Sequence, residues 1–188
     1  MVSSSFPRIM AVLMIATTGL VFAEEKQPFG DEKAVAYAEK LWRHLTDLKL
    51  VGENRTMSAP YEGVHPHGAF LDTIERSVTF EDNTGPVLIK RNYRGDDLTK
   101  REVWNNPDKH LELVTVMYQR GEYDPENNNW FWASFLPDGS LDTNPKGVKL
   151  AGRVGADEKA GCIACHRNAP GGDMVYAHDR YAADADEQ

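Results

Sequence analysis

The fold is decided by the stretch Trp130-Phe131-Trp132-Ala133-Ser134-Phe135, which the turn Pro137-Asp138-Gly139 closes. Side chains of a strand point alternately to opposite faces, so Trp130 and Trp132 share one face and Phe131 lies on the other. Bulky aromatic groups on both faces predict a strand inside a thick core, or a strand that forms an apolar wall against a bulky ligand.

Three further runs resemble strands, and together they predict an antiparallel sheet. The four predicted strands cover Phe70–Phe80, Val87–Tyr93, Leu111–Gln119 and Asn129–Phe135. The second and third carry β-branched or aromatic residues on both faces, which favours burial on two sides. The charged segment from Arg94 to Asp108 is predicted to be a connecting loop or a short helix.

One helix is predicted before the strands, from Asp31 to about Leu50. Asp31 can cap its first turn, and Gly52 lies just past its end. The apolar residues that share one helical face are Ala34, Ala38, Leu41, Trp42, Leu45 and Leu48. The predicted fold class is α+β, a mainly antiparallel β-sheet with an N-terminal amphipathic helix.

The chain's composition limits the classes of partner that it can bind. Its 188 residues include 21 Lys and Arg against 29 Asp and Glu, a net charge of -8, with no basic run. Binding of nucleic acid needs clustered Lys and Arg, so no nucleic-acid partner is expected. The length is that of one globular domain.

Residues 1–23 are predicted to be an export signal that is cleaved after Ala23. A polar start with Arg8 precedes the apolar run Ile9–Ala16, which is short for a membrane span and is soon interrupted by Thr17 and Thr18. An uncleaved anchor is the alternative. We expect a periplasmic protein with a polar lead over residues 24–30 and one domain over 31–188. The mature chain keeps 20 Lys and Arg against 29 Asp and Glu, a net charge of -9.

The chain's two cysteines lie in the motif Cys162-Ile163-Ala164-Cys165-His166. Two thiols three positions apart can each form a thioether with a haem vinyl group, and the adjacent histidine can bind the iron. A thioredoxin-like pair is expected near the start of a βαβ unit, and zinc would need two further ligands at suitable spacing. The motif therefore predicts one covalently attached haem c, with His166 as the proximal iron ligand, and makes the C-terminal segment a haem-binding segment.

The sequence does not offer an obvious sixth ligand for the iron. Met174 follows His166 too closely to reach the opposite side of a haem, and Met117 lies in an apolar strand where a core role is expected. Met57 is a remaining candidate. An open iron position is therefore predicted, and the strand signals argue against the four-helix cytochromes c′.

His65 and His67 flank a proline and could in principle bind a metal. Pro66 favours an extended backbone that points the two rings apart, and no third ligand lies nearby in the sequence. The pattern does not predict a metal site.

Several of these segments resemble the cytochrome P-460 family, which includes the sheet-rich cytochromes c′-beta. The resemblance covers about residues 31–180. It is carried by His67-Gly68, Val87-Leu88-Ile89-Lys90, Trp130-Phe131-Trp132-Ala133 with Pro137-Asp138-Gly139, and the cysteine motif with Asp173 soon after it. It implies a mainly antiparallel β fold, often a homodimer, with one five-coordinate c-type haem.

The resemblance implies two kinds of activity. Members with a lysine joined to the haem edge oxidise hydroxylamine, through an iron-nitrosyl, to nitrous oxide or related products. Members without that lysine cap the iron with phenylalanines and bind nitric oxide or carbon monoxide.

Lys90 aligns with a lysine common in the family and shares a strand face with Leu88, so it is the candidate for the haem cross-link. An ordinary solvated lysine is the alternative. The next residue, Arg91, stands where the family often has an acid. If the iron is capped, the candidates are Phe70 and Phe80, which share strand parity.

Oxidation of hydroxylamine also requires a base, for which Glu75, Asp72 and Glu112 are the candidates. We therefore expect oxidation of hydroxylamine, with binding of nitric oxide or carbon monoxide without turnover as one alternative and plain electron transfer as a second. Because the mature chain is acidic, a basic redox partner is expected.

Overall fold

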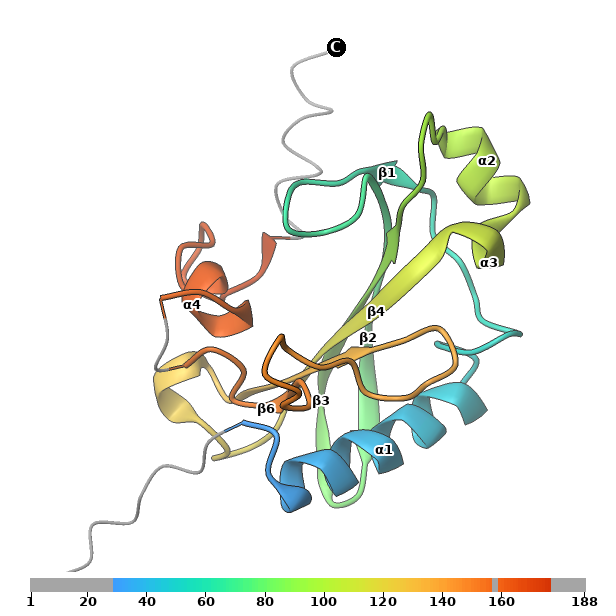
Figure 1. Ribbon diagram of the computed structural model, residues 1–188. Coiled ribbons are helices and arrows are strands. Elements are labelled where there is room, and N and C mark those ends of the chain that lie inside the picture. The colour runs from blue at the N-terminus through green and yellow to red at the C-terminus, as the bar shows by residue number, and fades with distance from the viewer. Residues whose placement is uncertain (1–28, 157–158, 177–188) are drawn as a thin grey trace, which may run out of the picture.

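A six-stranded antiparallel sheet forms the centre of the protein (Figure 1). The computed structural model describes residues 29–156 and 159–176. Each strand pairs with the next one along the chain, in the order β1-β2-β3-β4-β5-β6. The strands are β1 (Tyr61–Glu62), β2 (Phe70–Phe80), β3 (Asn83–Tyr93), β4 (Leu111–Gln119), β5 (Trp130–Phe135) and β6 (Ala151–Gly152). The helices are α1 (Glu32–Asp47), α2 (Lys100–Asn105), α3 (Pro107–His110), the 3-10 turn η1 (Pro125–Asn127) and α4 (Cys162–His166). The α+β prediction is confirmed.

Helix α1 begins as the sequence predicts and ends three residues early. The Asp31 carboxylate accepts a hydrogen bond from the Ala34 N–H at 2.8 Å, which caps the first turn. Lys49 adopts a positive φ of 56°, and this left-handed residue stops the helix before Leu50. Leu48 is 46% exposed, so its predicted place on the buried face is wrong.

Strand β3 begins at Asn83, four residues earlier than predicted. Phe80 pairs with Asn83 and Glu81 has a φ of 52°, so a two-residue turn joins β2 directly to β3. The residues between Asn83 and Pro86 are polar or small, and they join the strand through pairing with β2 rather than through their own hydrophobicity. The predicted connection after β3 contains α2 and α3.

Two apolar clusters cover the two faces of the sheet. Helix α1 packs on one face and α4 lies on the other side, as Figure 1 shows. The first cluster includes Tyr37, Leu41, Leu45, Ile89, Val116 and Phe131. The second includes Leu88, Met117, Trp130, Trp132, Ile163 and Met174. The predicted division of Trp130 and Trp132 from Phe131 is therefore confirmed.

The turn after β5 rests against α1. Gly139 has a φ of 88°, and a Cβ atom at this position would lie 2.2 Å from Trp42 Nε1. Glycine is required here both by the backbone angle and by the space that the indole occupies.

The predicted export signal, residues 1–23, lies outside the described residues, as does most of the polar lead. Among the helices of the described ranges, none is both long enough and apolar enough to cross a membrane.

Candidate haem site

Helix α4 presents the two thiols on one short turn. The Ile163 N–H donates to the Val154 carbonyl at 3.0 Å, and the Ile163 side chain is fully buried in the second cluster. Cys162 is half-buried and Cys165 is exposed, and both are free thiols. Burial raises the pKa of Cys162 to about 11. One side of this turn is thus anchored in the core while the cysteines remain available for thioether bonds.

The His166 ring is held in one orientation. Its Nδ1 hydrogen-bonds the Met174 carbonyl at 2.7 Å, so Nδ1 carries the proton and Nε2 keeps its lone pair. Burial lowers the pKa of His166 to about 4, and the positive charge of Lys90 acts in the same direction. A neutral imidazole whose other nitrogen donates to a carbonyl is the form in which histidine binds metals.

Three aromatic rings surround His166. The ring centroids of Trp132, Tyr176 and His67 lie 4.8, 5.2 and 6.3 Å from its own. In the part of the chain that the structure describes, Trp132 Nε1 is buried without a hydrogen-bond partner. A buried donor of this kind fits a bound group that supplies an acceptor, as a haem does with its propionates. Together with the free thiols, it shows that the residues fit haem c.

Lys90 lies on the sheet face that carries the second cluster. It pairs with Thr73 of β2 and Thr115 of β4, two residues along β3 from Leu88. The side chain is only 9% exposed, so the solvated-lysine alternative is wrong. Its charge contributes to the lowered pKa of both His67 and His166. The structure therefore brings Lys90 to the same site as His166.

The phenylalanine cap proposed from β2 is contradicted. Phe80 belongs to the first cluster, with its ring 5.2 Å from that of Tyr37 on α1. The pairing of β2 with β3 runs without a shift from Phe80 to Phe70, so Phe70 points to the same face. The prediction that the two residues share one face of the strand is confirmed. Because α1 packs on that face, it is the face away from the cysteine motif.

The three candidate carboxylates lie in different surroundings. Asp72 is fully buried on the face away from the cysteine motif, where it pairs with Arg91 at 2.5 Å. Glu112 pairs with Arg94 near the start of β4. Glu75 lies opposite Leu88, so it shares the face of Lys90 and is exposed to solvent.

His67 is the site residue that sequence reasoning did not find. Asn92 of β3 hydrogen-bonds His67 Nδ1 at 2.8 Å, and this contact holds the ring near His166. His65 is exposed, as expected if the two rings point apart. Within the described residues, no three His, Cys, Asp or Glu side chains gather in a metal-binding group. The signals in the sequence were the His65-Pro66-His67 run and the His67-Gly68 pair of the family resemblance, and neither indicated His166 as a neighbour.

The candidate sixth ligand Met117 packs in the second cluster and is 7% exposed, in keeping with its expected core role. Met174 contributes its carbonyl to His166 and its side chain to the same cluster.

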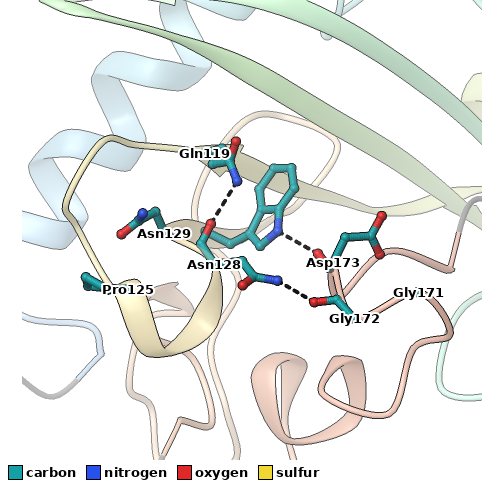
Figure 2. Close-up of a pocket in the computed structure, with 8 residues that line it drawn as sticks. Gln119, Pro125, Asn128, Asn129, Gly171, Gly172 and Asp173 are labelled. Carbon is teal, nitrogen blue, oxygen red and sulfur yellow. Dashed lines mark hydrogen bonds between the residues drawn. The ribbon is translucent and has the colours of Figure 1, made fainter.

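A loop before β5 fastens the C-terminal segment to the sheet. Asn128 donates to the Gly172 carbonyl at 2.7 Å, as Figure 2 shows, and the Trp130 indole donates to the Asp173 carbonyl at 2.9 Å. Arg167 donates to the Asn127 side chain at 3.0 Å. The open pocket at this seam is lined by Gln119, Pro125, Asn128, Asn129, Trp130, Gly171, Gly172 and Asp173. It adjoins the haem segment without including the cysteine motif or Lys90.

The fold and this site define the class as a c-type haem protein built on an antiparallel sheet. A family model for cytochrome P460 matches residues 55–177, and the chain belongs to this family. It is a c-type cytochrome, and its family implies that it binds haem c. The search of curated proteins and the search of solved structures each found no significant match.

Proposed function

We propose that this cytochrome is a periplasmic mono-haem protein that oxidises hydroxylamine. The observation that carries the proposal is the position of Lys90, a buried amine on the sheet face of the haem motif and within electrostatic reach of His166. Burial of an ammonium group costs free energy, so a buried lysine beside the haem motif is a candidate for a role in the site.

Three residues hold the cofactor in this proposal. Cys162 and Cys165 attach it covalently, while His166 binds the iron through Nε2, because its Nδ1 is engaged by Met174. When bound, the haem supplies the redox-active iron that accepts electrons from the substrate. The apolar second cluster, with Trp132 and Met117, excludes water from one side of the site.

Lys90 is proposed to form the covalent bond to the haem edge that the family resemblance implies for hydroxylamine-oxidising members. The bond would replace one N–H of Lys90 and one C–H of the haem edge, so the proposal includes a two-electron oxidant, such as a peroxide, that takes up the two hydrogens. The neighbours of Lys90 across the strands, Thr73 and Thr115, have shorter side chains than the lysine. Such a bond would distort the macrocycle, which is one way in which a protein tunes a haem.

Glu75 is the proposed proton acceptor. Hydroxylamine loses protons as well as electrons when it is oxidised, so a base beside the site is required. Glu75 shares the face of Lys90, whereas Asp72 lies on the opposite face, and the exposure of Glu75 gives the proton a route to solvent.

The test is peptide mapping of the haem in the exported protein. We expect the haem to be joined both to the Cys162–Cys165 peptide and to the peptide with Lys90, and we expect a red-shifted Soret band and turnover of hydroxylamine. Lys90→Met should leave the motif attachment intact, restore an ordinary c-type spectrum and abolish turnover. Lys109→Met is the matched control, since this lysine is 69% exposed and lies on α3.

Attachment through the cysteine motif alone in the unaltered protein would contradict the cross-link. Reversible binding of nitric oxide without turnover would then point to a gas-binding protein. N-terminal sequencing of the same material tests the export proposal, which expects the mature chain to begin at Glu24. The acidic mature chain is expected to pass electrons to a basic partner.

A further inference from the structure

Three consecutive backbone carbonyls after the haem motif, those of residues 172–174, each accept a hydrogen bond from a side chain. The first accepts from the Asn128 amide at 2.7 Å and the second from the Trp130 indole at 2.9 Å (Figure 2). The third accepts from His166 Nδ1 at 2.7 Å. Two of the donors belong to residues 124–130, which contain η1 and lead into β5, and we call these residues the η1 loop. The η1 loop and the proposed iron ligand therefore contact the same short piece of backbone.

Met174, which contacts His166 through its carbonyl, holds a backbone angle that its side chain disfavours. Its φ is 66°, in the left-handed region where a residue other than glycine costs free energy. The Asp173 carboxylate accepts from the Val175 N–H at 3.0 Å, and the side chains of Met174 and Val175 are buried in the second cluster. A disfavoured angle persists only where neighbouring contacts fix it, so the direction of this carbonyl depends on how the segment is held.

The η1 loop also holds the helix that carries His166. Arg167, the next residue, donates from Nε to the Asn127 side-chain oxygen at 3.0 Å. Asn127 is fully buried and donates to the Asp124 carboxylate at 2.6 Å. The helix with the donor ring and the segment with the acceptor carbonyl are thus fastened to the same loop.

Two neighbouring asparagines in the η1 loop share a backbone angle but differ in what their side chains contact. Asn128 and Asn129 have φ values of 53° and 60°, which asparagine tolerates better than most residues. The Asn128 side chain donates to the Gly172 carbonyl, whereas the Asn129 side chain accepts from the Asp124 N–H at 3.1 Å within the loop. The contact with the C-terminal segment can therefore be removed separately from a contact inside the loop.

The hydrogen bond of His166 bears on the electronic properties of a bound iron. An imidazole that donates its second nitrogen to an oxygen is a stronger base and a better electron donor to the metal. Stronger donation stabilises ferric iron relative to ferrous iron, which lowers the reduction potential. Contacts that keep the Met174 carbonyl close to His166 therefore affect the potential.

We propose that Asn128 and Trp130 are positioning residues for the proximal ligand, which hold the Met174 carbonyl in hydrogen-bond contact with that ligand and thereby lower the reduction potential of the haem iron. This inference rests on ligation of the iron by His166, which is part of the proposed function. It applies to a five-coordinate iron and does not depend on whether Lys90 is joined to the haem.

The test measures two properties of the purified haem protein: the iron–histidine stretching frequency of the ferrous form, by resonance Raman spectroscopy, and the reduction potential, by redox titration. Asn128→Gly keeps the left-handed angle and removes the amide donor, while Trp130→Phe keeps an aromatic ring and removes the indole N–H. We expect each to lower the stretching frequency and to shift the ferric–ferrous equilibrium about threefold towards the ferrous form, a rise of about 30 mV. Asn129→Gly is the matched control and should leave both values unchanged.

An unchanged frequency and potential in both variants would overturn the proposal. Equal shifts in Asn129→Gly would also overturn it, since they would show a general loosening of the loop. Haem content and urea unfolding of each variant show whether the cofactor and the fold are retained. Should Trp130→Phe fail to fold, Asn128→Gly gives the same comparison, because its side chain is only half-buried. An unaltered protein without an iron–histidine band would instead contradict ligation by His166, so failure of this inference and failure of the proposed function are distinguishable.

Discussion

Cys162 and Cys165 lie on one turn of α4 but in different surroundings. Because burial raises the pKa of Cys162 to about 11, far less of this thiol than of an ordinary cysteine is in the reactive thiolate form at pH 8. In haem-free protein we expect iodoacetamide to label the exposed Cys165 at least about tenfold faster than Cys162. Peptide mass mapping over time measures both rates. Equal rates in the folded protein would contradict this prediction, whereas equal rates in urea are expected.

Arg91 illustrates a residue whose neighbours explain its departure from the family pattern. Its guanidinium is fully buried, pairs with Asp72 at 2.5 Å and donates to the Leu50 and Thr56 carbonyls. Tyr93 donates to the second oxygen of Asp72 at 2.8 Å. Arg91, which stands where the family often has an acid, is therefore neutralised by an acid on the adjacent strand.

Arg91→Met should lower the free energy of unfolding by about 3–5 kcal/mol, since it leaves the Asp72 carboxylate buried without its cation. Urea unfolding measures the change. Lys40→Met is the control, because the Lys40–Glu81 pair is exposed and should contribute less than about 1 kcal/mol. A loss for Arg91→Met as small as that of the control would show that the buried network is not needed for stability.

At the scale of the element, the stability of α1 depends on the N-cap of its first turn. Asp31 accepts from the Ala34 N–H, so Asp31→Ala leaves that donor without its cap. We expect the free energy of unfolding to fall by about 1 kcal/mol, as measured by urea unfolding. Asp47→Ala is the opposite-end control: the carboxylate is exposed at the negative end of the helix dipole, so its removal should be neutral or slightly stabilising. Equal losses for the two variants would argue against capping as the cause.

The sheet also shows why elements were easier to predict than their exact ends. Strand β2 occupies Phe70–Phe80 and β4 occupies Leu111–Gln119, as the period-two pattern predicts. Strand β3 gains its first residues only by pairing with β2, and β5 starts at Trp130 because Asn129 has a left-handed φ of 60°. Such ends depend on backbone angles and pairing that a local hydrophobic pattern does not encode.

At the scale of the whole molecule, the haem-free protein should lose stability in acid. The pKa of His166 falls to about 4 through burial, and burial and Lys90 also lower the pKa of His67. An unfolded histidine has a pKa of about 6.5, so the unfolded chain takes up protons first as the pH falls. Stability is thus complete above about pH 6.5 and decreases towards pH 4, by up to about 3 kcal/mol for His166.

Urea unfolding of the haem-free protein at pH 7.5 and pH 4.5 measures this change. His166→Gln should reduce the difference between the two pH values, whereas the exposed His65→Gln should leave it unchanged. An unaltered difference in His166→Gln would assign the acid sensitivity to other groups.

The sequence by itself determined the cofactor motif, the α+β class, the alternation of Trp130, Phe131 and Trp132, and the family. These properties depend on the spacing of residues that are close together in the sequence. Side chains two residues apart share one face of a strand, and the two thiols of the haem motif are three residues apart.

Only the tertiary structure decided which sheet face receives the haem segment, because α1 and α4 could each cover either face as far as strand parity is concerned. That choice removed Phe70, Phe80 and Asp72 from the site and left Lys90 and Glu75 on its face. It also brought His67 beside His166 through a hydrogen bond to Asn92. The physical reason is that strand order, bends and loop anchors bring distant residues together through contacts that no stretch of sequence contains on its own.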